Sequence, residues 1–130
     1  MTSQHRNLAV VSGTMTNEPT SRELPDGTTV VQFDVSTVVE RNGIDGTAGK
    51  MAKAAKVSVP IAWRDPTAAA LAALVPGCDV VVSGRIERRF FRVGGSTQSR
   101  TELVADSCLP ARRRKSVRSL LGAARSQLEG

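Results

Sequence analysis

The stretch GCDVVVSGRIERRFFRV, from Gly77 to Val93, decides the expected fold. The two-residue period of a β-strand divides most of it into two sides. One side is apolar and can enter a core: Val80, Val82, Gly84 and Ile86. The other side carries cations: Val81, Ser83, Arg85, Glu87 and Arg89. Phe90, Phe91 and Arg92 follow, and this pattern suits a nucleic-acid-binding sheet, because phosphates attract cations and unpaired bases stack on flat rings. The alternative is an exposed hairpin with solvated arginines and two core phenylalanines.

The rest of the chain supplies the other elements of a small barrel. Four further strands are expected, at Asn7 to Met15, Thr28 to Glu40, Val57 to Trp63 and Gln98 to Leu109. Before the fourth strand, Asp65-Pro66 predicts an N-cap and the start of a short helix that ends at Pro76-Gly77. Three strands, a helix and two strands is the element order of an OB-fold, a five-stranded Greek-key barrel. We therefore expect an all-β domain over residues 1–110.

Positive charge is concentrated in a C-terminal tail. The chain has 18 Lys and Arg against 12 Asp and Glu, and residues 111–130 hold 6 of the first and 1 of the second. The body is therefore nearly neutral, so any basic surface on it must be local. The tail continues after four consecutive cations with apolar residues at helical spacing and Ser116 as a candidate cap. We predict a basic tail that is able to form a helix, alone or on a partner.

Composition also argues against several classes of protein. No apolar run approaches the ~20 residues of a membrane span, and the N-terminus does not resemble a signal peptide, so a cytoplasmic protein is expected. Cys78 and Cys108 lack CxxC spacing, which argues against zinc, and the sequence leaves open whether they form a disulfide. The single His5 and the absence of catalytic motifs argue against an enzyme, and no cofactor is expected.

A second local excess of cations lies between the second and third expected strands. The segment RNGIDGTAGKMAKAA, from Arg41 to Ala55, is rich in glycine and predicts a long hairpin loop. With Lys56 it supplies four cations: Arg41, Lys50, Lys53 and Lys56. Its GTAGK lacks the first glycine and the final Ser or Thr of a phosphate-binding loop. A solvated basic loop is therefore the preferred interpretation.

The order and spacing of several short motifs resemble a known family over residues 6–110. The first set is Gly13, Glu18-Pro19, Arg22, Gly27, Val30 and Phe33. The second is Gly77, Val80 to Val82, Gly84-Arg85-Ile86 and Arg88-Arg89, with Trp63 before it and RTELVAD after it. With these motifs the chain resembles the bacterial single-stranded DNA-binding proteins. The resemblance implies an OB-fold that binds single strands, most often as a homotetramer.

The resemblance also implies roles for individual residues. Trp63, and Phe91 or its neighbour Phe90, match positions where the family stacks bases, and Arg85, Arg88 and Arg89 match basic strand positions. Two departures are visible. Arg41 and Val57 stand where other members often carry a stacking aromatic, and the acidic C-terminal tip that recruits other proteins is absent. Recruitment of repair proteins by such a tail is therefore not expected.

The sequence thus predicts sequence-independent binding of single-stranded DNA in replication, recombination or repair, without catalysis. The expected contacts are Trp63, Arg85, Arg88, Arg89, Phe90, Phe91, Arg92, Arg41, Lys50, Lys53 and Lys56. The alternative is a non-catalytic OB-fold module that binds protein or structured RNA. The small number of aromatic residues and the near-neutral body favour that alternative.

Overall fold

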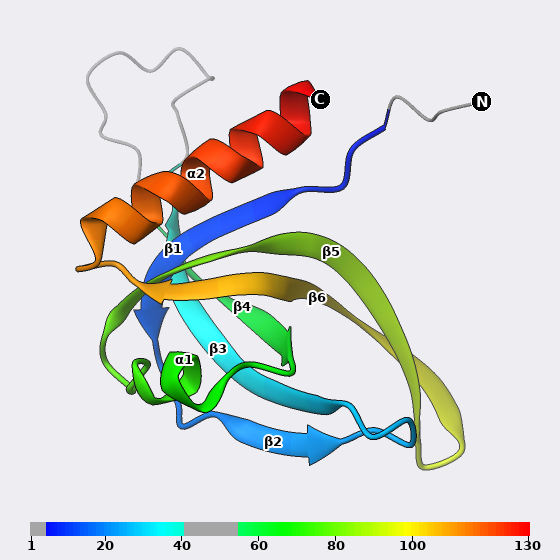
Figure 1. Ribbon diagram of the computed structural model, residues 1–130. Helices are drawn as coiled ribbons and strands as arrows, with labels where there is room; N and C mark the ends of the chain where they lie inside the picture. The colour runs from blue at the N-terminus through cyan, green and yellow to red at the C-terminus, as the bar shows by residue number, and fades with distance from the viewer. Residues whose placement is uncertain (1–4, 41–54) are drawn as a thin grey trace.

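The structure is a computed structural model that describes residues 5–40 and 55–130. Its elements in chain order are β1 (Ala9–Met15), β2 (Thr20–Glu23), β3 (Thr29–Val39), β4 (Ala55–Arg64), α1 (Ala68–Ala72), β5 (Asp79–Val93), β6 (Ser96–Pro110) and α2 (Arg114–Glu129). The strands form one sheet in the order β1-β5-β6-β4-β3-β2, and an extra pairing of β1 with β3 closes it into a barrel (Figure 1). The predicted all-β OB-fold is confirmed.

The barrel encloses an apolar core to which the five long strands all contribute. Met15, Phe33, Ile61, Val82 and Leu103 are each buried to within 2 % of complete burial. Neighbouring strands are antiparallel except β4 and β6, which run parallel with Ile61 opposite Leu103. The short helix α1 lies at one end of the barrel, where its side chains pack on the core. Period-two burial of branched residues therefore produces the closed sheet.

The structure corrects two details of the expected elements. The interval between the first two expected strands, where no strand was predicted, contains a sixth strand, β2, whose four residues are all exposed and which pairs with β3. An exposed edge strand has no apolar face, so alternation could not reveal it. The cap of α1 is Thr67, whose hydroxyl accepts from the Ala70 amide, rather than Asp65. Asp65 instead has φ +46° and accepts a hydrogen bond from the Thr29 amide at 3.0 Å.

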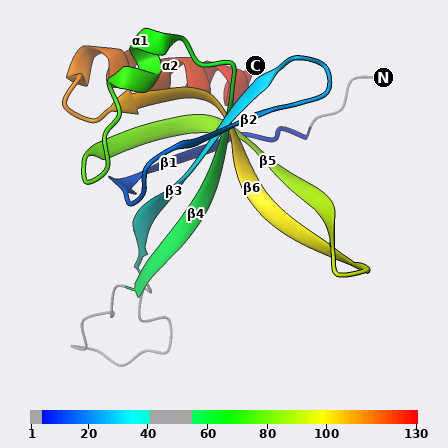
Figure 2. The same cartoon turned by 90° about the horizontal axis from the view of Figure 1, so that it is seen from below.

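The long hairpin of β5 and β6 extends beyond the barrel. Its turn is Gly94-Gly95, both with positive φ, which permits a two-residue turn matched to the twist of the strands. Nearer the barrel the register shifts at Ser83/Gly84, opposite Asp106. A Cβ on Gly84 would lie 2.0 Å from the Val104 carbonyl oxygen, so the close approach of the strands requires glycine here. Toward its tip the hairpin diverges from β3 and β4 (Figure 2).

Because the hairpin leaves the barrel, the side of β5 that was expected to enter the core is buried over only part of its length. Val80 and Val82 enter the core as predicted, but Ile86 is 43 % exposed. Beyond Gly84 the strand has left the closed part of the sheet, and both of its sides lie outside the core. Alternation in a single strand identifies which residues share a side, whereas closure of the barrel decides how far that side is buried.

The tail forms a helix that packs on the chain's own body. Leu120 and Ala124 of α2 are buried, and they face β5 and β6 near Gly84 and Asp106. The helix begins at Arg114, before the expected cap Ser116, and its N-cap Arg113 makes no side-chain capping bond. All six cations of the tail are exposed: Arg112, Arg113, Arg114, Lys115, Arg118 and Arg125. Figure 1 shows α2 at the end of the molecule away from the hairpin tip.

Candidate nucleic-acid interface

The β5–β6 hairpin sorts its cations onto two sides by strand alternation. Arg85 and Arg89 lie on one side with carboxylates: Arg85 contacts Glu87 and lies 3.6 Å from Asp106. Arg89 Nε lies 3.7 Å from Glu102 Oε1. These arginines are therefore already partly neutralised in the free protein.

The opposite side of β5 forms an exposed row of Ile86, Arg88, Phe90 and Arg92, called the open row below. Neither Arg88 nor Arg92 forms an ion pair within the described part of the chain. The cross-strand partners of Arg88, Phe90 and Arg92 are hydroxyl residues of β6: Thr101, Ser99 and Thr97. Because no carboxylate lies opposite these residues on β6, the guanidinium groups of Arg88 and Arg92 are available to phosphates.

The side of the hairpin that carries Arg89 borders a groove on the outside of the barrel. Its floor is Val30, Ala62 and Val104, each 5 % exposed and each on a different strand. The groove has a volume of about 180 Å³ and adjoins a second hollow of about 150 Å³. Gln32 and Glu102 line both hollows, so they stand where the two meet. The outer face of the sheet therefore holds a groove with an apolar floor, which continues past Gln32 and Glu102 into a hollow lined mostly by polar residues.

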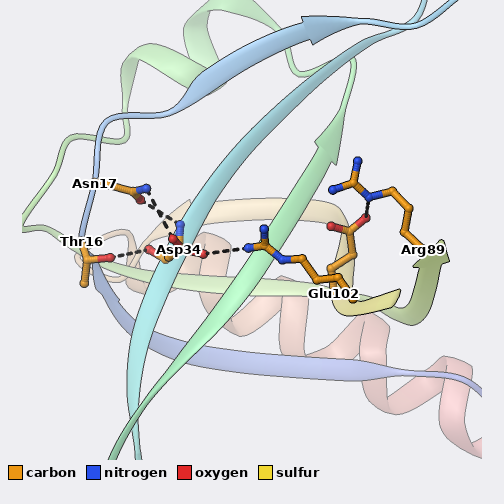
Figure 3. A network of polar contacts seen from close by, with 6 residues as sticks. Thr16, Asn17, Asp34, Arg89 and Glu102 are labelled. Carbon is orange, nitrogen blue, oxygen red and sulfur yellow. Dashed lines mark hydrogen bonds and ion pairs between the residues drawn. The ribbon is translucent and has the colours of Figure 1, made fainter. Parts of the chain in front are cut away.

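Two carboxylates lie on this face, and one of them joins the hairpin to β3 (Figure 3). Asp34 of β3 accepts from Arg100 at 3.4 Å, and its backbone amide donates to Asn17 at 2.9 Å. Glu102 of β6, 7 % exposed, lies beside Arg89. These contacts bring residues far apart in the sequence onto one polar surface, where charge is nearly balanced.

The structure shows that the aromatic rings predicted to contact DNA differ in their exposure. Trp63 is 5 % exposed and belongs to the core cluster, which corrects the expectation that its ring is open to a base. Its strand position is on the apolar side, and barrel closure buries that side. Phe90 is 67 % exposed in the open row. Phe91 points to the other side and is half-buried, with the Arg89 guanidinium carbon 5.5 Å from its ring centre. Phe90 is therefore the ring most accessible for stacking.

Comparison with known proteins identifies the family of the chain. The sequence profile of the single-strand binding protein family matches residues 6–110. The chain belongs to this family. Among solved structures it resembles the "Plasmodium falciparum SSB complex with ssDNA", with a TM-score of 0.63 and 21 % identity over 80 % of this chain and 89 % of that one. At this identity the likeness supports the fold. A search of curated proteins found no match.

The predicted cations outside the hairpin are only partly described. Lys56 is exposed near the start of β4, next to Val57. Arg41, Lys50 and Lys53 lie outside the described residues, so their part in this family member's interface stays a prediction. Lys56 lies on β4 rather than β5, and its part in an interface that would extend beyond the hairpin also stays a prediction.

Two arginines of the groove were not among the predicted contacts. Arg22 of β2 and Arg64 of β4 are both paired in register with Val30, one on each side. Both are exposed, both line the groove, and neither forms an ion pair in the described ranges. Arg22 was visible only as part of the family motif, and Arg64 directly follows Trp63. Their proximity depends on strand register, which neither position reveals alone.

The two cysteines have no disulfide between them. Cys108 is buried, and burial raises the pKa of its thiol, whereas Cys78 is partly exposed. Among the described residues, no group of three or more His, Cys, Asp and Glu side chains could hold a metal ion, and no helix is long and apolar enough to cross a membrane.

Proposed function

We propose that the protein binds single-stranded DNA through the open row and the rim of the groove, largely independently of sequence. Single-stranded DNA is the ligand of the family to which the chain belongs. The observation that carries the assignment of residues is the open row, in which Arg88 and Arg92 flank Phe90 without a paired carboxylate. Guanidinium groups bind phosphates, and an exposed ring stacks on any base.

The other cations act as secondary contacts. Arg22 and Arg64 lie at the groove rim, where a backbone that crosses from the hairpin would meet them. Arg85 and Arg89 already have carboxylate partners, so a phosphate would have to compete with Glu87 and Glu102. Lys56, with Arg41, Lys50 and Lys53 as predicted from sequence, would extend the track along β4. No catalytic step is proposed.

We further propose a homo-oligomer, and a tetramer by family resemblance. In support, one edge of β1 pairs with β5, whereas its other edge pairs with β3 only at Thr14 and Met15. At Ser12 this edge only accepts a hydrogen bond from the Thr37 hydroxyl, and from Ala9 to Val11 it pairs with no strand of the described chain; open strand edges favour pairing with another chain. A cytoplasmic role in replication, recombination or repair remains the prediction made from the sequence.

The test is a competition titration of a labelled dT oligomer with unlabelled dT, duplex DNA and RNA. We expect dT to compete best, and equal competition by duplex would contradict the proposal. If about five phosphates are neutralised per subunit, log K should fall with log[salt] at a slope near about −3.5. A salt-independent affinity, or binding to RNA or protein alone, would favour the alternative of an OB-fold module with another partner.

A further inference from the structure

The groove contains a buried acid whose environment is incomplete. Glu102 is 7 % exposed, and it accepts no hydrogen bond from the residues that the structure describes. Its cationic neighbour is Arg89, but the 3.7 Å between Nε and Oε1 exceeds the ~2.7–3.2 Å of a hydrogen bond. Arg89 Nε is itself buried and has no acceptor within the described chain. The carboxylate oxygens of Glu102 are not sealed from solvent, so a ligand that supplies N–H groups can reach them, and hydrogen bonds to a charged acceptor are among the stronger ones.

The surroundings of Glu102 suit a flat ring rather than a phosphate. Gln32, Ala62 and Val104 are neighbours in register on β3, β4 and β6, so the Gln32 side chain stands beside the apolar floor. The volume of about 180 Å³ greatly exceeds the ~10–15 Å³ that one water needs. Glu102 and Glu87 would repel a phosphate placed against them, whereas the arginines that also line the groove, Arg22, Arg64, Arg88 and Arg89, favour a phosphate at its rim. The groove is therefore a place for a base, with the backbone outside on the rim.

We propose that this groove is a subsite for one unpaired guanine. A carboxylate only accepts hydrogen bonds, and guanine presents two adjacent donors, N1–H and the N2 amino group, to the two oxygens of Glu102. The Gln32 amide, which has no side-chain partner in the described chain, can donate to O6. Thymine offers one N–H between two carbonyl oxygens, and cytosine or adenine a single amino group beside an acceptor.

This inference rests on the proposed function, because only an unpaired base presents these atoms. It adds to that function a preference at one position of a strand held mainly by charge and stacking. One bidentate contact of this kind discriminates by ~1–3 kcal/mol, so a preference of about fivefold or more is expected.

The experiment compares oligomers of about twelve nucleotides, within the ~4–16-nucleotide site of one OB-fold. One is all dT, one carries isolated dG residues, and one carries dI in the same places, which lacks only the N2 amino group. Affinities are measured by fluorescence anisotropy for the wild type, Glu102→Gln and Glu23→Gln. Glu23 lies on β2 in an exposed position, opposite in alternation to Arg22, so its variant removes an equal charge outside the groove.

The wild type should bind the dG oligomer about fivefold tighter than dT, and dI should lose most of this gain. Glu102→Gln should abolish the preference while still binding dT, whereas Glu23→Gln should keep it. Equal wild-type affinities for dG, dI and dT would overturn the guanine subsite while leaving single-strand binding intact. Failure of the wild type to bind any of the three oligomers would instead overturn the proposed function. The dI comparison uses the unaltered protein, so the test stands even if Glu102→Gln does not fold.

Discussion

The two sides of the hairpin predict unequal effects of removing arginines. In the double variant Arg88→Ala/Arg92→Ala, two cations without ion-pair partners in the described chain are lost. Each phosphate contact to a single strand contributes ~0.7 to the salt slope, so the slope should flatten by about 1.4. Each phosphate contact favours binding by releasing counterions, and this gain grows as the salt concentration falls. Counted from 1 M salt, a slope change of 1.4 amounts to about a 25-fold loss of affinity for dT at 0.1 M salt.

The matched control is Arg85→Ala/Arg89→Ala, which removes the same charge from the same strand. These arginines already contact Glu87, Asp106 and Glu102, so their loss should change the slope by less than half as much. Anisotropy titrations of labelled dT at four salt concentrations would measure both slopes. If the two double variants flatten the slope equally, or if Arg88→Ala/Arg92→Ala leaves it unchanged, the distinction between paired and open cations is wrong.

Four further outcomes follow from burial and packing. Phe90→Ala should weaken dT binding by the ~1–3 kcal/mol of one stacked base, measured by the same titration, and no loss would remove Phe90 from the interface. Trp63 emission should change little when dT is added, and strong quenching would show that the ring is accessible. Gly84→Ala should lower the free energy of unfolding by ~1–3 kcal/mol or more in urea titrations, because its Cβ would collide with the Val104 carbonyl, and unchanged stability would refute that close approach. A thiol reagent at neutral pH should modify Cys78 first, since burial raises the pKa of the Cys108 thiol, and equal rates before unfolding would contradict this.

Removal of the C-terminal tail tests one further prediction. Truncation after Pro110 removes α2, of which Leu120 and Ala124 are buried on the body. Because burying a leucine is worth ~1.5–3 kcal/mol, we expect a lower melting temperature. Native mass spectrometry of the truncated protein with and without dT would then separate two possible roles of the tail: dissociation of the oligomer points to a subunit interface, and weaker DNA binding at unchanged mass points to phosphate contacts by its cations.

Much of this protein could be predicted from local pattern. Alternation in β3, β4 and β5, the Pro-Gly stop after α1 and the two-glycine turn of the hairpin are properties of short windows, and they suffice for the barrel and its element order. The motifs shared with the family indicated that the ligand is single-stranded DNA. The strand β2 could not be predicted, because its four residues are all exposed and have no apolar side that would give a periodic signal.

What only the tertiary structure decided is which of these residues face a ligand. Trp63 and Phe90 are both aromatic residues on strands, yet closure of the barrel buries the first and the hairpin's departure from it exposes the second. Likewise Arg22 and Arg64 become neighbours of Val30, and Glu102 comes to lie beside Arg89, only through register between strands. Sequence determines the sides of each strand, because alternation is local; it does not determine what lies across from each side, because register and closure depend on the whole sheet.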